Sequence, residues 1–449
     1  MIGRVIVLKF GGTSVGDAST IRQVVGIVQR ALPHQPVVVV SAHAGVTDML
    51  LDLATAAPAG AADVTAIAAL HRRILGDLGL ATDLLDPLLQ ELADLARGLK
   101  LVGEAGPRAK DHLASFGERC CARTVAAALT AAGVPATAVD AFAAGLRTDS
   151  AWGRARPLPD EGRIARHLAN VGGVPVVTGY IAADEHGNIT TLGRNGSDYS
   201  AALFGAALGA TEIQIWKDVD GVRSADPRLV PTALPLRAMS FHEACAMASF
   251  GAKVLHPATM LPAWAKGIPV RVLSTREPDA PGTAILAGEL PTPEAAGVTA
   301  IAHRANVALL TVRSQRLLPQ HAFLARVFDE LARAEIDASS IAVGEAAVTF
   351  AVDAAAAELL LAPLSAAGDV AIERDQAVIG VVGRGLAIRA GAAAAVLDAL
   401  ARARVPVRCT TQGADGSTLA VVVAAAEVAK AVRTLHDRFF AATTTEVRA

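Results

Sequence analysis

Lys9 and the glycines that follow it form the segment of this chain best suited to binding phosphate. The apolar run at 5–8 ends on Lys9, and Gly11 and Gly12 come almost directly after it. Glycine lets backbone N–H groups approach an anion closely, a helix starting near Asp17 would add the positive end of its dipole, and the lysine adds a full charge. The pattern predicts a phosphate site, with an ordinary turn at the glycines as the alternative.

A second lysine, Lys253, stands beside Gly251 in the segment Phe-Gly-Ala-Lys-Val-Leu-His-Pro at 250–257. It could supply another cation for phosphate, or it could only lay its stem along an apolar helix surface. The chain contains no G-x-x-x-x-G-K-[ST] segment, so a Walker-type phosphate loop is excluded.

An arginine and an aspartate flank a glycine turn in the segment Leu-Gly-Arg-Asn-Gly-Ser-Asp-Tyr-Ser at 192–200. A guanidinium such as that of Arg194 binds a carboxylate with two hydrogen bonds. Asp198 could accept from an ammonium group or orient lysines around a phosphate, and Gly196 and Ser197 lie between the two charges. We therefore expect this segment to bind a small molecule that carries a carboxylate.

Two further segments carry polar groups that could contact such a molecule. Ser41 and Thr47 follow the apolar run at 37–40, and open α/β sheets bind ligands at the carboxyl ends of their strands. Helix N-capping is the alternative for these hydroxyls. Glu118 stands near the start of an expected Ala/Cys/Val-rich helix, where it could bind an ammonium group or be a first-turn acid favoured by the helix dipole.

The order of apolar runs predicts an α/β fold for the first part of the chain. Continuous apolar runs at 37–40, 174–177 and 213–216 alternate with Ala-rich stretches of helical character at 21–32 and 200–208. Such runs are typical of parallel strands buried on both faces by helices. A length of 449 residues, 52% of them hydrophobic and 4% aromatic, fits two or three globular domains.

Prolines and glycines crowd residues 277–298 and predict a domain junction there. Beyond it, a strand, a helix and two further strands occur twice, and each copy is followed by another helix. The first copy is expected at 307–312, 322–334, 339–343, 347–352 and 354–366, and the second at 377–382, 392–404, 407–411, 419–423 and 425–439. The repeat predicts a pair of α+β domains of the βαββαβ kind whose sheets exchange strands.

Composition argues against several classes of function. A net charge of −2 offers no basic face for nucleic acid. No apolar stretch reaches the roughly 18–20 residues of a membrane-spanning helix and no secretory signal pattern opens the chain, so we expect a cytoplasmic protein. The cysteines show no C-x-x-C spacing, which predicts buried thiols rather than a zinc site or a disulfide framework: Cys120, Cys121, Cys245 and Cys409.

Taken together, these segments resemble the aspartokinases, which have the amino-acid kinase fold. The matching segments are those at 9–16, 192–200 and 250–257, with Asp-Val-Asp-Gly-Val at 218–222 and Ala-Asp-Pro-Arg at 225–228. The resemblance covers nearly the whole chain and is strongest to the lysine-sensitive monofunctional type III. It implies a three-layer catalytic domain with a mainly parallel sheet at 1–290 and paired, interleaved ACT regulatory domains at 298–449.

The resemblance implies transfer of the γ-phosphoryl group of MgATP to the β-carboxylate of L-aspartate, the first step toward lysine, threonine and methionine. Arg194 would bind the α-carboxylate, Glu118 the ammonium group, and Ser41 and Thr47 the β-carboxylate. Gly196 and Ser197 would complete the substrate-binding residues. The β-carboxylate is ionised at neutral pH and needs no general base.

On the nucleotide side, the resemblance assigns Lys9, Asp198 and Lys253 to catalysis. Lys9 and Lys253 would contact phosphates, and Asp198 would organise the lysines. The other residues implied to bind the nucleotide are Gly11, Gly12, Lys217, Asp218, Arg223, Arg228 and Val254. Mg²⁺ would be held through phosphate oxygens and water, so no protein ligand for a metal is expected.

In the regulatory half, the resemblance places an effector, lysine or threonine, near Leu317, Gln320, Phe323, Leu324 and Ser339. The family's effector-binding aspartate aligns with Ser339, and the nearest carboxylate is that of Asp337. We therefore expect an altered or lost response to the effector unless Asp337 substitutes. ACT sheets generally pair across subunits, which implies a homodimer or a dimer of dimers.

Other functions remain open at this point. Asp48 stands where the family has asparagine and Arg223 where it has tyrosine, so a kinase for an aspartate analogue is one alternative. A non-catalytic subunit that senses an amino acid is another. Val-Val-Gly-Arg-Gly at 381–385 weakly resembles a dinucleotide fingerprint, but its third glycine is misplaced and an oxidoreductase is disfavoured.

Overall fold

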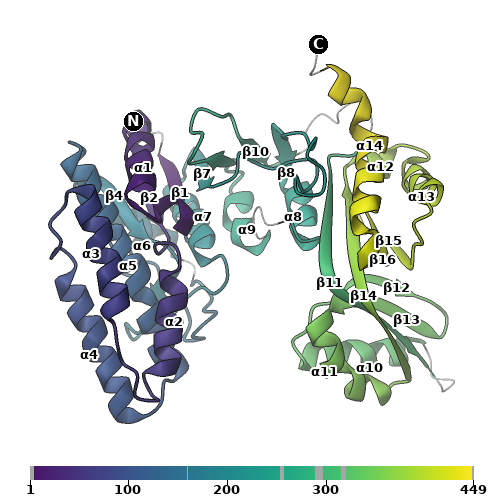
Figure 1. The fold of residues 1–449 in the computed structure, drawn as a ribbon, viewed down its shortest axis with the longest axis horizontal. Helices are drawn as coiled ribbons and strands as arrows, with labels where there is room; N and C mark the ends of the chain where they lie inside the picture. The colour runs from purple at the N-terminus through teal and green to yellow at the C-terminus, as the bar shows by residue number, and fades with distance from the viewer. Residues whose placement is uncertain (1–4, 159, 253–256, 289–296, 315–319, 447–449) are drawn as a thin grey trace. The chain divides into compact units, whose positions relative to one another are not determined.

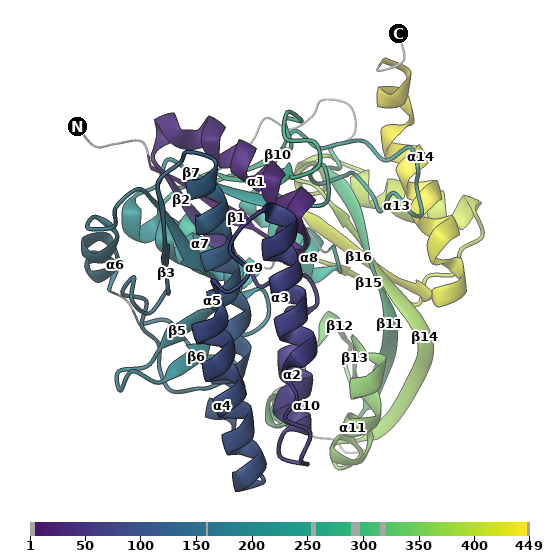
Figure 2. The ribbon, with the colours of Figure 1, turned by 60° about the vertical axis from the view of Figure 1, so that its left-hand side comes forward.

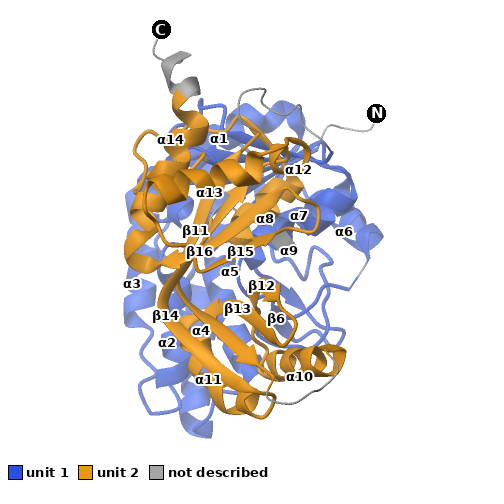
Figure 3. Ribbon diagram, turned by 90° about the vertical axis from the view of Figure 1, so that its right-hand side faces the viewer, with its two compact units in different colours: residues 1–222, 255–288 blue, residues 223–254, 289–449 orange. Residues whose placement is uncertain are grey.

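The computed structural model describes residues 5–158, 160–252, 257–288, 297–314 and 320–446. The chain forms two compact units, one of residues 1–222 and 255–288 and the other of residues 223–254 and 289–449 (Figure 3). None of the described helices is long and apolar enough to span a membrane.

The first unit is built on a mainly parallel sheet with the strand order β3-β4-β2-β1-β7-β9-β10. All neighbouring strands are parallel except β10, which runs antiparallel to β9. The strands are β1 (Ile6–Phe10), β2 (Pro36–Val40), β3 (Ala136–Val139), β4 (Val174–Thr178), β7 (Glu212–Lys217), β9 (Val270–Ser274) and β10 (Thr283–Leu286). A separate hairpin pairs β5 (Ile181–Ala183) with β6 (Ile189–Thr191).

Helices cover both faces of this sheet and give it three layers. On one face, α1 (Ala18–Ala31) and α5 (Pro107–Ala131) share a core with Leu8 and Phe10 of β1. The intervening Lys9 points to the other face, because side chains alternate along a strand, and there it meets α7 (Gly196–Leu208). This face also holds α6 (Glu161–Leu168) and α9 (Pro257–Ala265), which pack on α7.

Three more helices extend the layer that contains α5. They share with α5 an apolar core of their own and run alongside it (Figure 2). They are α2 (Val46–Ala56), α3 (Thr65–Leu78) and α4 (Asp86–Val102). The three-layer α/β fold predicted for this part of the chain is therefore confirmed.

The second unit contains an antiparallel sheet with the strand order β12-β13-β11-β14-β16-β15. Its two central strands are 14 residues long and lie side by side (Figure 1). The strands are β11 (Ala300–Arg313), β12 (Ser339–Val343), β13 (Ala347–Asp353), β14 (Asp369–Val382), β15 (Cys409–Gln412) and β16 (Thr418–Ala424). A short strand, β8 (Ala238–Ser240), and α8 (Phe241–Ser249) also belong to this unit.

The two central strands pass through both halves of this sheet, so the two domains interleave. Residues 307–313 of β11 pair with β13, while residues 376–382 of β14 pair with β16. One half is covered by α10 (Gln320–Arg333) and α11 (Ala354–Ser365). The other half packs against α12 (Gly385–Ile388), α13 (Ala392–Arg402) and α14 (Val428–Glu446). This arrangement confirms the predicted pair of α+β domains.

Some expectations need correction. β11 and β14 are longer than the predicted strands at 307–312 and 377–382, because polar residues interrupt the apolar runs in their added halves at 300–306 and 369–376. The segment at 381–385 ends an antiparallel strand and is followed by a four-residue helix, which is not the parallel βαβ setting of a dinucleotide site. Cys120 and Cys121 are buried free thiols as predicted, but Cys245 and Cys409 are only half-buried.

Candidate active site

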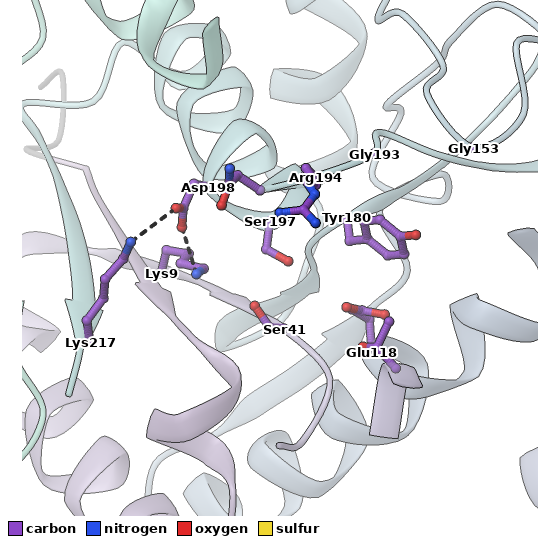
Figure 4. A pocket seen from close by; sticks show the side chains of 13 residues that line it. Lys9, Ser41, Glu118, Gly153, Tyr180, Gly193, Arg194, Ser197, Asp198 and Lys217 are labelled. Carbon is purple, nitrogen blue, oxygen red and sulfur yellow. Dashed lines mark ion pairs between the residues drawn. The ribbon is translucent and has the colours of Figure 1, made fainter. Parts of the chain in front are cut away.

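A cavity of about 470 Å³ opens in the first unit at the carboxyl ends of β1 and β2 and at the N-terminus of α7 (Figure 4). Its wall is rich in charged side chains, hydroxyls and glycines. The lining residues are Lys9, Ser41, Thr47, Glu118, Gly153, Tyr180, Gly193, Arg194, Asn195, Gly196, Ser197, Asp198 and Lys217. The carboxyl ends of neighbouring parallel strands meet at one edge of a sheet, which explains why segments so distant in sequence converge here.

One end of the cavity holds two lysines around a single aspartate. Nζ of Lys9 lies 2.7 Å from one carboxylate oxygen of Asp198, and Nζ of Lys217 lies 3.6 Å from the other (Figure 4). Burial alone would raise the pKa of Asp198, but the two lysines outweigh it and hold that pKa below its usual value. Two cations share one carboxylate, so this group of three carries net positive charge, as a phosphate site requires.

Lys217 is the less tightly held of the two lysines. Burial lowers the pKa of its ammonium group, and Asp198 opposes that effect. Lys217 lies farther from the Asp198 carboxylate than Lys9 does, at 3.6 Å against 2.7 Å.

Glu118 lies at the other end of the cavity and in the middle of α5, so the first-turn alternative is wrong. Its Oε1 accepts a hydrogen bond from the backbone N–H of Ala42 at 3.1 Å. Its buried Oε2 has no hydrogen-bond partner within the described residues. Burial raises the pKa of Glu118 to about 8, although the Ala42 N–H and Lys9 partly offset that rise. A buried, unpartnered carboxylate oxygen of this kind suits a cationic group of a ligand.

A glycine brings Glu118 against the loop that carries Ser41 and Thr47. A Cβ on Gly117 would stand 2.7 Å from Cβ of Ala42, so only glycine allows α5 to approach this loop so closely. The N-cap of α2 is Gly45, with φ of 79° and no side-chain cap. The capping alternative for the two hydroxyls is therefore wrong, and both line the cavity.

Arg194 stands at a tight turn before α7. Gly193 and Asn195 on either side of it adopt left-handed conformations, with φ of 76° and 56°. The Arg194 side chain is exposed, and in the described part of the chain it has no hydrogen-bond or ion-pair partner. Its guanidinium points toward the same region as Ser197 and Tyr180 in Figure 4. It is therefore available to bind a carboxylate from solution.

Some predicted nucleotide-binding residues do not line this cavity. Gly11 donates to the backbone oxygen of Trp216 at 3.2 Å, and Gly12 begins a 3₁₀ turn directly after β1. Asp218 is exposed just beyond β7. Two more belong to the second unit, where Arg223 donates to the backbone oxygen of Ala233 and Arg228 pairs with Asp226. Lys253 and Val254 lie outside the described residues.

The predicted effector residues belong to the second unit. Gln320 donates to the backbone oxygen of Gly344, Phe323 is buried and Leu324 is half-buried. Oγ of Ser339 accepts a hydrogen bond of 2.6 Å from the guanidinium of Arg304. Asp337 is exposed, and Leu317 lies outside the described residues.

The cavity wall also includes four residues that the sequence analysis did not single out. Tyr180 lies two residues after the end of β4, so the rule that ligands bind at the carboxyl ends of strands could have indicated it. Gly193 and Asn195 lie inside the segment at 192–200 that was identified for its charges. Gly153 comes from an irregular loop and had no signal in the sequence.

Comparisons with known proteins agree with this geometry. The amino acid kinase family matches residues 4–274, and an ACT domain matches residues 379–439. Lysine-sensitive aspartokinase 3 of Escherichia coli is 33% identical, over 98% of this chain and 100% of the relative, and chloroplastic aspartokinase 2 of Arabidopsis thaliana is 33% identical, over 97% and 84%. The crystal structure of E. coli aspartokinase III in complex with aspartate and ADP covers 97% of this chain and 100% of its own, with a TM-score of 0.82 and 32% identity.

Proposed function

This chain belongs to the aspartokinase family, and we propose on that basis that it transfers the γ-phosphoryl group of ATP to the β-carboxylate of L-aspartate, giving 4-phospho-L-aspartate and ADP. The observation that carries this proposal is the polarity of the cavity. Glu118 offers a partnerless carboxylate oxygen at one end, and Lys9 and Lys217 gather around Asp198 at the other. Such a cavity suits an acceptor with an ammonium group at one end and a carboxylate that meets a phosphate at the other.

We assign acceptor binding to residues from three segments of the first unit. Arg194 holds the α-carboxylate with its free guanidinium, and Glu118 accepts from the α-ammonium group. Ser41 and Thr47 donate to the β-carboxylate, with Ser197 and the backbone of Gly196 beside them. The β-carboxylate is already ionised, so the protein has to orient its oxygen toward phosphorus rather than remove a proton.

Catalysis in this scheme comes from placing positive charge where the phosphoryl group passes. Lys9 and Lys217 neutralise negative charge that spreads onto the phosphoryl oxygens, and Asp198 keeps both ammonium groups in place before substrate binds. The backbone of Gly11 and Gly12 contacts the phosphates. Asp218 belongs to the nucleotide side in this proposal, and the nucleotide roles of Lys253, Val254, Arg223 and Arg228 stay predictions from the family resemblance.

Mg²⁺ enters this proposal as part of the MgATP substrate. The described residues contain no group of three His, Cys, Asp or Glu side chains that could hold a metal ion. Of the two carboxylates in the cavity, Asp198 is engaged by lysines and Glu118 lies at the acceptor end. In this proposal the ion is held by phosphate oxygens and water, and no step depends on a metal bound by the protein.

We also propose that residues 1–290 form the catalytic domain and residues 298–449 the regulatory ACT pair, in a homodimer or a dimer of dimers. The E. coli relative is a lysine-sensitive enzyme by name. In this chain Ser339 replaces the expected carboxylate and is already hydrogen-bonded to Arg304. The regulatory half is therefore expected to bind lysine or threonine weakly.

The proposed activity is tested by trapping the acyl phosphate with hydroxylamine. Purified protein is incubated with MgATP and L-aspartate, L-glutamate or no acceptor, and the hydroxamate is measured. The proposal predicts hydroxamate with aspartate and little with glutamate. Absence of hydroxamate with every acceptor would contradict it and favour an amino-acid-sensing subunit.

A further inference from the structure

A buried aspartate that the proposed chemistry does not use lies close to the acceptor end of the cavity. Asp111 is 4% exposed and stands on α5 seven residues before Glu118. Residues seven apart share one face of a helix, so both carboxylates lie on the side of α5 that faces the cavity loops. The side chain of Asp111 is not among those that line the cavity.

Asp111 joins two segments that form the cavity wall. One of its oxygens accepts from the backbone N–H groups of Gly153 and Thr191, at 2.9 and 2.8 Å. The other accepts from the hydroxyl of Thr191 at 2.9 Å. Gly153 lines the cavity itself, and Thr191 ends β6 two residues before Gly193. A single buried carboxylate thus joins the loop at Gly153 to the end of β6, which leads into the turn at Arg194.

The contacts continue from Thr191 to the wall of the cavity. The N–H of Leu192, the residue after Thr191, donates a hydrogen bond of 2.9 Å to the backbone oxygen of Tyr180. A carboxylate can only accept, so the Thr191 hydroxyl donates its proton to Asp111. Tyr180 has a left-handed backbone, with φ of 64°, a conformation that costs free energy unless its surroundings hold it.

The tyrosine ring closes one side of the acceptor end. A Cβ on Gly196 would lie 2.8 Å from Cδ2 of Tyr180, so the ring packs directly on the first turn of α7. In Figure 4 the ring lies next to Arg194 and Ser197 and faces Glu118. These are the residues assigned above to the α-carboxylate and ammonium end of the acceptor.

We propose that Asp111, Thr191 and the backbone bond from Leu192 to Tyr180 form a hydrogen-bonded relay in which Tyr180 is a further acceptor-binding residue and Asp111 a positioning residue. The relay holds the tyrosine ring and the turn at Arg194 in the geometry that the acceptor needs before it binds. It deepens the proposed function, on which it rests, and assigns these residues to acceptor affinity rather than to nucleotide binding. Preorganisation of this kind lowers the free energy that binding must spend on ordering the site.

A neighbouring threonine offers a matched control. Thr190 and Thr191 are both fully buried on β6, and each has a side-chain hydrogen bond. Thr190 bonds to the hydroxyl of Thr148 at 2.6 Å, away from Asp111. Thr190→Val and Thr191→Val therefore remove one buried hydroxyl each, from the same strand, and only the second breaks the relay.

The experiment measures KM for aspartate, KM for ATP and kcat in the full-length protein, with the melting temperature of each variant. Thr191→Val is expected to raise KM for aspartate about tenfold, the equivalent of one lost buried hydrogen bond, and to leave KM for ATP unchanged. Thr190→Val is expected to change neither KM. Asp111→Ala should raise KM for aspartate more than Thr191→Val does.

Asp111→Asn distinguishes a positioning role from a need for charge. The amide oxygen can still accept from the two backbone N–H groups, and the amide nitrogen can donate to the Thr191 hydroxyl. This variant is therefore expected to recover most of the aspartate affinity that Asp111→Ala loses. Failure of that rescue in a variant with the wild-type melting temperature would overturn the relay.

Two further outcomes would also overturn the proposal. One is an equal rise of KM for aspartate and for ATP in Thr191→Val, and the other is the same effect in Thr190→Val as in Thr191→Val. A wild-type protein without aspartate-dependent turnover would contradict the proposed function instead. In that case, the shift in melting temperature on adding aspartate tests the relay directly: Thr191→Val must reduce the shift and Thr190→Val must not.

Discussion

The cavity of the first unit and the surroundings of Ser339 in the second unit differ in how their charged side chains are paired. In the cavity, Lys9 and Lys217 share one carboxylate, and Glu118 keeps an oxygen without a partner. Around Ser339, the guanidinium of Arg304 is matched by a hydroxyl. The first arrangement leaves a buried carboxylate oxygen for a ligand to pair with, whereas in the second the arginine is paired with a neutral hydroxyl where a carboxylate is expected.

This difference matches the different chemical requirements of the two units. Phosphoryl transfer needs several charges at fixed positions, because stabilisation of the transition state is mainly electrostatic. Binding a regulatory amino acid needs only a few partners for its ammonium and carboxylate groups. Loss of one carboxylate is enough to weaken such a site, and Ser339 stands where that carboxylate is expected.

Removing a lysine from the cavity should have the largest effect on activity. Lys9→Ala takes away the cation 2.7 Å from Asp198 and is expected to lower kcat by about two to three orders of magnitude. Lys266→Ala is a matched control, because Lys266 forms a half-exposed ion pair with Glu161 in the same unit. Steady-state kinetics should show little change in the control. Similar losses in both variants would mean that Lys9 has only a general electrostatic effect.

Neutralising the acceptor end should have the next largest effect. Glu118→Gln keeps the size of the side chain but removes its charge, and KM for aspartate is expected to rise about 10- to 100-fold. Glu212→Gln, which affects a partly exposed pair with Arg271, serves as the control. An unchanged KM for aspartate in Glu118→Gln would remove this residue from the acceptor site.

The raised pKa of Glu118 predicts a pH dependence of aspartate binding. Below the pKa of about 8, the free site holds a protonated carboxyl group, which must lose its proton before it can pair with an ammonium group. KM for aspartate should therefore rise as the pH falls below about 8, by about tenfold per unit, and level off above it. Glu118→Gln should abolish this slope, and a slope that persists in the variant would assign the titration to another group.

The smallest effect is expected in the second unit. Added lysine should inhibit the wild-type protein less than twofold at millimolar concentration, because Ser339 offers no charge to an ammonium group. Ser339→Asp should increase the inhibition only slightly, since the adjacent Arg304 would pair with the new carboxylate. Inhibition curves of both proteins test this. Strong inhibition of the wild type by lysine would contradict the view that the second unit lacks a charge for the effector.

Much of the fold was predictable because its signals are local. The runs at 37–40 and 174–177 are continuous and apolar, and both became buried parallel strands. The extended halves of β11 and β14 were not predictable, because each is held by pairing with the apolar half of the other strand, which lies far away in the sequence. Register between such distant segments leaves no periodic pattern in the sequence.

The candidate site was predictable where charge and glycine occur together, as at Lys9 and at Arg194 to Asp198. The position of Glu118 in mid-helix was not, because the start of α5 at Pro107 carries no capping side chain. Tyr180 and Asp111 were not predicted, for another reason. Their contribution depends on hydrogen bonds between β6 and α5, segments 80 residues apart in the chain.

The central claim is that an oxygen of the aspartate β-carboxylate attacks the γ-phosphorus of ATP, and isotope transfer tests it most directly. Aspartate labelled with ¹⁸O in its β-carboxylate is incubated with protein, MgATP and hydroxylamine, and the phosphate released is analysed by mass spectrometry. Hydroxylamine attacks the acyl carbon, so the bridging oxygen leaves with phosphate. The account predicts one ¹⁸O in each phosphate that accompanies hydroxamate formation. Phosphate without the label would contradict it.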